Sequence, residues 1–117
     1  LRSFIYIDDF CEAIFKALSK SKNGEVYNVS SNELISIKDL IKKICIKMNK
    51  KFSEVVYLEK DRLGKDQKYF MDSKKANKYL KWKNKINLDK GLEKVINWQL
   101  ANKKVLKKLK IQYTHKA

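Results

Sequence analysis

Apolar residues recur with helical spacing most clearly between residues 37 and 48. The positions that fall on one face of this segment are Ile37, Leu40, Ile41, Ile44, Cys45 and Met48. Ser36 stands where an N-cap hydroxyl is favoured, and Asp39 places a carboxylate in the first turn, where the helix dipole stabilises it. The pattern therefore predicts a helix that begins after Ser36 and ends before Lys50.

The first 29 residues predict a strand, a helix and a second strand. Residues 3–7 read as a short strand, after which Asp8 or Asp9 is placed to cap a helix that runs to about Ser19. The apolar positions on one face of this helix are Phe10, Ile14, Ala17 and Leu18. Asn23-Gly24 is a stop signal, since Gly readily adopts the left-handed conformation after a helix. Residues 25–29 (Glu-Val-Tyr-Asn-Val) predict the second strand.

The C-terminal half predicts a third strand and two more helices. Residues 54–58 read as a strand and are followed by a polar loop from Glu59 to Gln67, with residues 68–71 extended. Ser73 is placed to cap a short helix that ends near 80–82. Asn87 is placed to cap a long helix that either continues through Lys110 or frays in its basic last part. The side chains predicted to point inward from this helix are Leu88, Leu92, Val95, Ile96 and Leu100.

Strands that alternate with helices predict a small α/β unit with short strands and about four helices. The 117 residues fit one small domain. Three short strands make a sheet that needs a neighbour to cover it. We divide the chain into a lobe over residues 1–102 and a basic helical extension and tail over residues 103–117.

The net charge of +15 first suggests a nucleic acid or an anionic surface as partner. Of the 28 basic residues, 26 are Lys, and only Arg2 and Arg62 are Arg. Nucleic-acid readers depend on Arg, because its planar fork grips phosphate and guanine with two hydrogen bonds. We therefore expect solvated Lys side chains on helix surfaces rather than a nucleic-acid partner. The excess lies almost wholly in residues 36–117, which carry 24 basic and 8 acidic side chains.

Cys11 and Cys45 each lie on the apolar side of a predicted helix. This predicts buried, reduced thiols and fits a cytoplasmic compartment. The spacing of the cysteines with the single histidine, His115, predicts no metal site. No apolar run is long enough to predict a membrane span. The chain opens at Leu1 directly in a strand-like pattern, which we interpret as a fragment or a processed piece.

Four blocks of sequence, in order, resemble the extended short-chain dehydrogenase/reductase family, the NAD-dependent epimerases and dehydratases. The first block, residues 2–9, is similar to the family's Arg-Asp-Trp/Phe-x-Tyr-Val-x-Asp. The second, residues 24–29 followed by Asn32-Glu33, is similar to Gly-Glu-x-Tyr-Asn-Ile. Each block alone is a weak signal, whereas four blocks in the right order and spacing are a strong one.

Within the family, the four blocks together most closely resemble the dTDP-glucose 4,6-dehydratases. The third block, residues 61–66, then Tyr69 and residues 72–74, is similar to Asp-Arg-Pro-Gly-His-Asp, a Tyr and Asp-x-Ser-Lys. The fourth begins with residues 80–82 (Leu-Lys-Trp), similar to Leu-Gly-Trp, and continues with Gly91-Leu92 and residues 98–102. The sequence departs from the pattern at Ser3 for Asp, Leu63 for Pro and Lys65 for His, and these departures weaken the assignment of a particular substrate.

The resemblance implies a C-terminal substrate-binding lobe without its Rossmann domain. In the family, an N-terminal doubly wound domain holds NAD, the catalytic Tyr-x-x-x-Lys pair and the Asp-Glu acid–base pair. The resemblance places these motifs outside the part of the family that this chain matches, and its glycines (Gly24, Gly64 and Gly91) form no phosphate-cradling loop. We therefore expect no catalytic, cofactor-binding or metal-binding residue here. We expect enzymatic activity in the parent protein and not in this chain alone.

The same resemblance implies the parent's chemistry and partners. NAD would oxidise the sugar at C4, water would be eliminated across C5–C6, and the hydride would return to C6. The ligand would be a dTDP- or UDP-hexose, with no nucleic acid and no membrane, and the parent would be a homodimer. This lobe would position the substrate rather than make or break bonds.

Four residues are candidates for binding the substrate: Arg2, Ser36, Arg62 and Lys65. The arginines match family positions that contact the diphosphate, and a guanidinium fits phosphate oxygens at fixed angles. The alternative for each Arg is a pairing with a nearby Asp, such as Asp8 or Asp61. Ser36 falls near a family position that hydrogen-bonds the phosphates, and the alternative is a helix cap alone. Lys65 stands where the dehydratases have His beside the nucleotide.

Matches at Tyr27, Asn28, Tyr69, Asp72 and Trp82 are better explained by structural roles. Within the family, a UDP-sugar 4-epimerase or a UDP-glucuronate decarboxylase is the near alternative. From another class, a small basic nucleic-acid-binding module is the rival, and it predicts strongly salt-dependent binding. A third alternative is a non-catalytic piece that makes only protein contacts.

Overall fold

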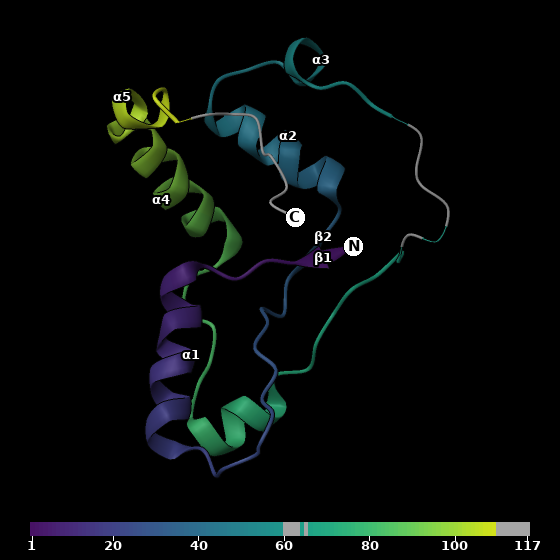
Figure 1. Cartoon of the computed structure of the whole chain (residues 1–117). Coiled ribbons are helices and arrows are strands. Elements are labelled where there is room, and N and C mark those ends of the chain that lie inside the picture. The colour runs from purple at the N-terminus through teal and green to yellow at the C-terminus, as the bar shows by residue number, and fades with distance from the viewer. Residues whose placement is uncertain (60–63, 65, 110–117) are drawn as a thin grey trace, which may run out of the picture.

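The computed structural model describes residues 1–59, 64 and 66–109, and it divides them into two groups of helices joined by a two-stranded ladder (Figure 1). The elements in chain order are β1 (Arg2–Ser3), α1 (Ile7–Lys20), β2 (Leu34–Ile35), α2 (Ile37–Lys47), α3 (Phe52–Val55), η1 (Ala76–Leu80), α4 (Leu88–Ala101) and α5 (Lys103–Leu106). One group contains α1 and η1, the other α2, α4 and α5, and the ladder lies between them. The predicted α/β class, with few short strands and several helices, is confirmed.

The sheet is smaller than the sequence predicted. β1 pairs antiparallel with β2, Arg2 opposite Ile35 and Ser3 opposite Leu34, and Tyr69 adds an isolated parallel bridge to Arg2. The predicted strand at 3–7 is wrong beyond Ser3, because Ile7 already begins α1. The predictions of strands at 25–29 and 54–58 are also wrong. A strand needs a partner for its backbone groups, and the described residues offer none to either segment.

Residues 52–55 instead close one helical turn, α3, in which Val56 N donates to Phe52 O at 3.1 Å. The turn follows Asn49, which takes a positive φ of 51° just past the end of α2. Asn tolerates that conformation better than most residues. The chain is therefore already turning before it reaches the Val55-Val56 pair that suggested a strand.

Helix α1 was predicted at the right place but with the wrong face inward. Asp9 and Ala13 are buried, at 2% and 4% exposure, whereas Leu18 on the apolar face is 80% exposed. Cys11, expected to be buried, is exposed, and only Cys45 confirms that expectation. The predicted cap at Asp8 or Asp9 is wrong too, since Tyr6 is the N-cap and both aspartates lie in the first turn.

A buried carboxylate explains why α1 turns its polar side inward. Asp9 Oδ2 accepts hydrogen bonds from the backbone N–H groups of Lys85 and Ile86, at 3.0 and 2.9 Å. The carbonyl of Asp9 accepts a 2.8 Å bond from Nε1 of Trp82. Buried polar groups need such partners, and here they tie α1 to the segment that precedes α4. The expected structural role of Trp82 is confirmed.

The core of this half of the molecule forms around Trp82, which is 1% exposed. Its other buried members are Ala13, Ala76 and Leu80, with Ile5, Ala17, Tyr27 and Val29 packed against them. Helix η1, which the sequence predicted from Ser73 to about 80–82, ends as expected at Leu80. The residues Ala76–Leu80 form a wider π turn, in which Lys81 N donates to Ala76 O, and Trp82 N donates to the same carbonyl at 3.3 Å.

Lys81 ends η1 in the left-handed conformation, with φ 54° and ψ 36°. This is the position at which the resembled family has Gly in its Leu-Gly-Trp pattern. A side chain there costs about 1 kcal/mol or more relative to Gly. The left-handed conformation of Lys81 turns the chain so that Trp82 lies against α1, where its indole N–H bonds to Asp9.

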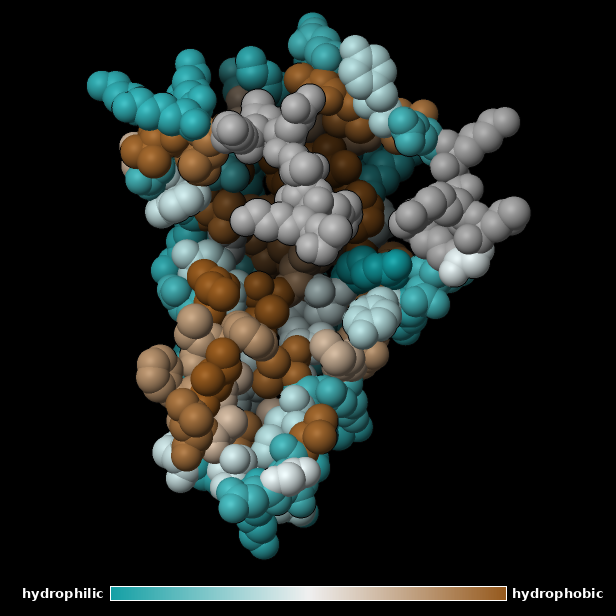
Figure 2. Space-filling model, viewed as in Figure 1, coloured by the Kyte–Doolittle hydropathy of each residue, from teal (hydrophilic) through white to brown (hydrophobic). Residues whose placement is uncertain are grey.

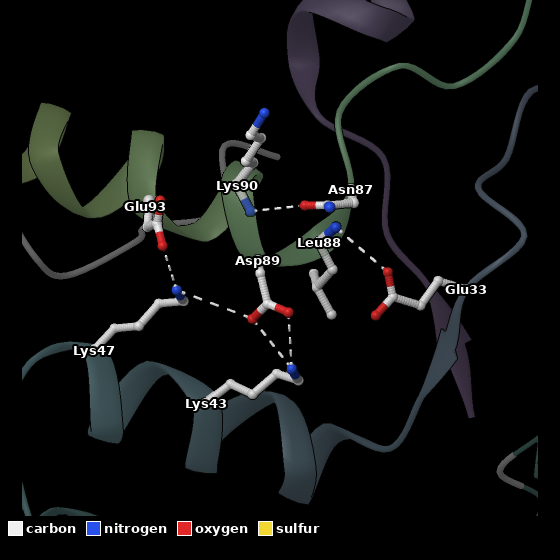
Figure 3. A network of polar contacts seen from close by, with 8 residues as sticks. All are labelled: Glu33, Lys43, Lys47, Asn87, Leu88, Asp89, Lys90 and Glu93. Carbon is white, nitrogen blue, oxygen red and sulfur yellow. Dashed lines mark hydrogen bonds and ion pairs between the residues drawn. The ribbon is translucent and has the colours of Figure 1, made fainter.

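Helices α2 and α4 pack side by side through a network of charged and polar contacts (Figure 3). Asp89 accepts from Lys43 at 3.1 Å, and Glu93 accepts from Lys47 at 2.8 Å. The predicted cap of α4 is confirmed, because Asn87 Oδ1 accepts from Lys90 N at 2.9 Å. These ion pairs are exposed, so each contributes less than about 1 kcal/mol. Their value lies in fixing how α4 lies along α2.

The long final helix ends earlier than the predicted limit of Lys110. Asn102 interrupts it, because its side-chain amide donates to Trp98 O at 2.8 Å, and α5 follows as a separate turn. Asn competes in this way with the backbone ladder of a helix. The inward positions are confirmed at Leu88, Leu92 and Ile96, which are half-buried, but not at Val95 and Leu100, which are 43% and 58% exposed. Residues 110–117 lie outside the described part.

Among residues 1–59, 64 and 66–109, no helix has both the length and the apolar content that a membrane span needs. The same residues contain no cluster of three His, Cys, Asp or Glu side chains able to hold a metal ion.

Asp9→Ala should lower the free energy of unfolding by about 2–4 kcal/mol, because it removes a buried carboxylate and leaves two part-buried backbone donors without their acceptor. The neighbouring Asp8→Ala is the matched control. Asp8 is exposed, and its one ion pair within the described residues is with Lys94 at 3.9 Å, so its loss should change the stability by less than about 0.5 kcal/mol. Urea unfolding measures both, and equal effects would contradict the anchoring role of Asp9.

Lys81→Gly should raise the free energy of unfolding by about 0.5–1 kcal/mol, because Gly adopts the left-handed conformation without steric cost. Lys83→Gly, two residues away at a position without positive φ, should lower it by a similar amount through the entropy of the unfolded chain. Thermal unfolding of the two variants gives the comparison. A loss of stability in both would show that Lys81 is not strained.

Candidate functional site

Two of the predicted site residues, Arg2 and Ser36, line the same cavity, which has a volume of about 480 Å³. Its walls are formed by the N-terminal residues, by the first turn of α2, and by α3. The segments on either side of residues 60–65 complete the lining. The ladder explains how residues 34 positions apart meet here, because Arg2 pairs with Ile35, the neighbour of Ser36. The floor is apolar at Ile37, Ile41 and Val56.

Arg2 is held in place from several sides. Its Nη1 donates to the carbonyls of Leu1 and Asp66, at 2.8 and 3.1 Å, and its guanidinium carbon lies 6.0 Å from the centre of the Tyr69 ring. The alternative partner that the sequence offered, Asp8, lies against Lys94 instead. A half-buried guanidinium fixed at the rim of a cavity is well placed to meet an anionic ligand.

Ser36 caps α2, as the sequence predicted. Its Oγ accepts from Asp39 N at 3.0 Å and donates to Asp39 Oδ2 at 2.7 Å. This hydroxyl, and then Lys42 at 3.4 Å, hold the pKa of the Asp39 carboxyl below its ordinary value. The start of α2 therefore already carries a negative charge. An anion in the cavity would meet that charge, so Arg2 and Lys38, which also line it, matter more for attraction than the helix end.

Arg62 and Lys65 lie outside the described residues. Glu59 and Asp66, which flank residues 60–65, both line the cavity. The structure therefore brings together two of the four predicted site residues and does not describe the other two.

Sequence reasoning missed a second, polar cavity of about 510 Å³. Ser30, Asn32, Asp72 and Asn84 line it, and Oδ1 of Asn84 is buried without a hydrogen-bond partner among the described residues. Asp72 also has the predicted turn role, since its carboxylate accepts from Lys74 N at 2.8 Å. Asn32, residues 72–74 and Trp82, which line this cavity, belong to the resembled sequence blocks, but Asp72 and Trp82 were interpreted as structural residues rather than as a site.

Comparison with known proteins identifies the group to which this arrangement belongs. The family model described as GDP-mannose 4,6 dehydratase matches residues 1–95. A probable dTDP-glucose 4,6-dehydratase of Sinorhizobium fredii is 32% identical over 109 residues, which cover 87% of this chain and 31% of the relative. The predicted resemblance to the extended short-chain dehydrogenases, and to dTDP-glucose 4,6-dehydratases in particular, is confirmed.

Solved structures give the same result. The dTDP-glucose 4,6-dehydratase of Bacillus anthracis, in complex with NAD, superposes with a TM-score of 0.78 at 25% identity over 88% of this chain and 32% of that one. The Bordetella bronchiseptica enzyme WbmF, in complex with NAD⁺ and UDP, has a TM-score of 0.74 at 28% identity over 91% and 31%. The chain thus spans about three tenths of the length of the proteins it matches.

Ser36→Ala should cost about 1 kcal/mol of folding free energy through loss of the cap, and it should raise the pKa of Asp39 toward its ordinary value. Ser36→Asn is the matched variant, because Asn also caps helices well and should cost less than half as much. Because the folded pKa of Asp39 is depressed, its stabilising effect exists at neutral pH and is lost as the pH falls through that pKa. An NMR titration of Asp39 with urea unfolding measures both quantities. An unchanged pKa in Ser36→Ala would contradict the observed hydrogen bond.

Proposed function

The chain belongs to the GDP-mannose 4,6-dehydratase family, within the extended short-chain dehydrogenases, and on that premise we propose that it binds the nucleotide and diphosphate of a nucleotide-sugar for a 4,6-dehydratase. The observation that carries the proposal is the meeting of Arg2 and Ser36 in one cavity. Its volume of about 480 Å³ falls within the roughly 300–1,000 Å³ of known small-molecule sites.

The mixture of charged and apolar residues in the cavity lining supports this assignment. Arg2 and Lys38 are its basic residues, Glu59 and Asp66 are acidic, and Ile37, Ile41 and Val56 offer apolar surface. A nucleoside diphosphate has an anionic diphosphate, which the basic side chains can bind, and a flat base, which the apolar surface can contact. The relative WbmF was crystallised with UDP, which has this chemistry. We assign Arg62 and Lys65 to the same ligand from the sequence resemblance alone.

This chain contributes positioning rather than bond-making. Its glycines do not fit a dinucleotide, because Gly24 lies in the turn after α1 and Gly91 lies inside α4 against the Tyr6 side chain. Neither opens a helix with a phosphate-binding loop. We therefore assign NAD to a part that the relatives have outside the matched region, and no step of the hydride transfer to residues of this chain. By holding the diphosphate, Arg2 would aim the hexose at that cofactor.

Titration with UDP and with dTDP, followed by amide chemical shifts, should move the signals of Arg2 and Ser36 and saturate at millimolar ligand. Arg2→Lys keeps the charge but loses the two-pronged grip, so the apparent Kd should rise about tenfold, or about 1.4 kcal/mol. Lys78→Ala, outside the cavity, is the matched control and should leave the Kd unchanged.

A short DNA duplex in a parallel titration separates this proposal from a nucleic-acid-binding module. We expect weak shifts that salt abolishes. If the duplex moved the lysine signals strongly while UDP and dTDP left Arg2 and Ser36 unmoved, the nucleotide-sugar proposal would fail.

A further inference from the structure

The polar cavity of about 510 Å³ is separate from the candidate nucleotide cavity, because the two share no lining residue. Three segments that are distant in sequence form it. They contribute Ser30 and Asn32, then Phe70, Asp72, Ser73, Lys74 and Asn77, and finally Trp82, Lys83 and Asn84. Figure 2 shows hydrophilic side chains over the segment that leads into η1, whereas apolar side chains gather over α1. The cavity is therefore large enough for a small molecule, and its lining favours a polar one.

Hydrogen bonds hold the walls of the polar cavity together. Ser30 N donates to Ser73 Oγ at 2.8 Å, and this hydroxyl donates to Ser30 O at 3.3 Å. Ser30 Oγ donates in turn to Ser3 Oγ at 2.9 Å. Trp82 is 1% exposed and belongs to the core. The cavity is therefore part of the folded chain and is formed before any ligand arrives.

Asn84 brings an unsatisfied acceptor to the polar cavity. Its Nδ2 donates to Ile86 O at 2.8 Å, and this bond fixes the orientation of the amide. Its Oδ1 is buried and accepts no hydrogen bond from the described part of the chain. A buried acceptor without a donor costs folding free energy, so an orphaned oxygen in a native fold indicates a donor from outside the chain. A ligand hydroxyl is a donor of this kind.

Two further amides line the polar cavity, those of Asn32 and Asn77. Both side chains are exposed, so a ligand in the cavity can reach them. Each amide offers two donor hydrogens and one acceptor oxygen. A hydroxyl group also donates and accepts, so several hydroxyls on one ligand can pair with such amides. With Asn84, the lining therefore matches a ligand that carries hydroxyl groups around its rim.

The charged residues of the lining favour an uncharged ligand. Asp72 pairs with Lys74, with Oδ2 and Nζ 3.3 Å apart. Lys83 is the remaining charged residue of the lining. A cation would be repelled by Lys83, and a phosphate would find no arginine fork among the lining residues. An uncharged hydroxyl, in contrast, can accept a hydrogen bond from the Lys83 ammonium group.

Phe70 provides the accessible apolar surface of the polar cavity. Its side chain is 45% exposed, whereas the other aromatic residue of the lining, Trp82, is buried. The face of an aromatic ring can cover an apolar C–H surface. A pyranose ring has such a C–H face together with a rim of hydroxyl groups, so it matches both parts of the lining.

We propose that the polar cavity binds an uncharged pyranose ring, one hydroxyl of which donates to Asn84 Oδ1. Further hydroxyls bond to the amides of Asn32 and Asn77, and Phe70 covers the C–H face. The site is distinct from the nucleotide site, so the proposal does not rest on the proposed function. The pyranose is either a free sugar or one unit of a glycan, and the first experiment separates these two sources.

Titration of the full chain with the methyl α-glycosides of glucose, galactose and mannose, followed by NMR, tests the site. With at least one of them, the side-chain amide signals of Asn32, Asn77 and Asn84 should shift together and saturate with a Kd of about 1–10 mM. Excess UDP should not reverse these shifts. The matching disaccharide should bind several-fold more tightly if the source is a glycan, and no more tightly if it is a free sugar.

Substitutions in the lining give the second test. Asn84→Ala should raise the Kd for the glycoside about tenfold, because it removes the buried acceptor. Asn77→Ala and Phe70→Ala should each raise it about fivefold, and since both side chains are exposed, these variants should keep the melting temperature of the parent chain. The matched control is Asn97→Ala, an exposed asparagine in α4 outside the cavity, which should leave the Kd unchanged.

Three results would overturn the proposal. If none of the glycosides moved the amide signals at about 50 mM, water alone would occupy the cavity. If inorganic phosphate moved the same signals at lower concentration than any glycoside, the cavity would be an anion site. If Asn77→Ala and Asn97→Ala changed the Kd equally, the sugar would bind elsewhere. Because UDP binding is followed at Arg2 and Ser36, the nucleotide-sugar proposal and this one can fail independently.

Discussion

The buried contact between Asp9 and the segment from Trp82 to Ile86 is the constraint on which the rest of the structure depends. One residue accepts three hydrogen bonds: its carbonyl takes the indole N–H, and its carboxylate takes two backbone N–H groups. A buried carboxylate needs hydrogen-bond donors around it. This contact therefore fixes the orientation in which α1 packs against the segment from Trp82 to Ile86. That orientation sets the path of the chain into α4, and α4 in turn lies along α2, whose first turn forms the cavity (Figures 1 and 3).

The same constraint explains what the sequence could and could not predict. Capping by Ser36 and Asn87 and the anchoring by Trp82 follow from local chemistry and are found. Gly24 takes the positive φ that the sequence suggested, 79°, but it lies in a separate turn, because α1 ends at Lys20 with an extended Ser21 as its C-cap. The packed face of α1 could not be predicted, because periodicity favours the apolar stripe and gives no hint that a carboxylate is buried. The strand at 25–29 failed because strand propensity describes a residue's fitness for a sheet, whereas a strand also needs a pairing partner, and none of the described segments pairs with residues 25–29.

The candidate site was predictable only in part, for reasons that differ between residues. Arg2 was singled out because it matches a family position that contacts the diphosphate, in a chain with arginine at just two positions, and the ladder with β2 brings it to the cavity. Ser36 was singled out because it falls near a family position that hydrogen-bonds the phosphates. Its bond to the Asp39 carboxylate, which places a negative charge near an approaching anion, depends on side-chain geometry that the sequence does not give. Some of the many lysine side chains form ion pairs, such as Lys43–Asp89 and Lys75–Glu25, as expected for solvated helix surfaces.

Intermolecular NOEs from bound UDP test most directly whether the cavity at Arg2 and Ser36 receives a nucleotide. We expect contacts from the uracil and ribose protons to the methyl groups of Ile37, Ile41 and Val56, which line that cavity. Contacts instead to Phe70 and Trp82, which line the second, polar cavity, would contradict it.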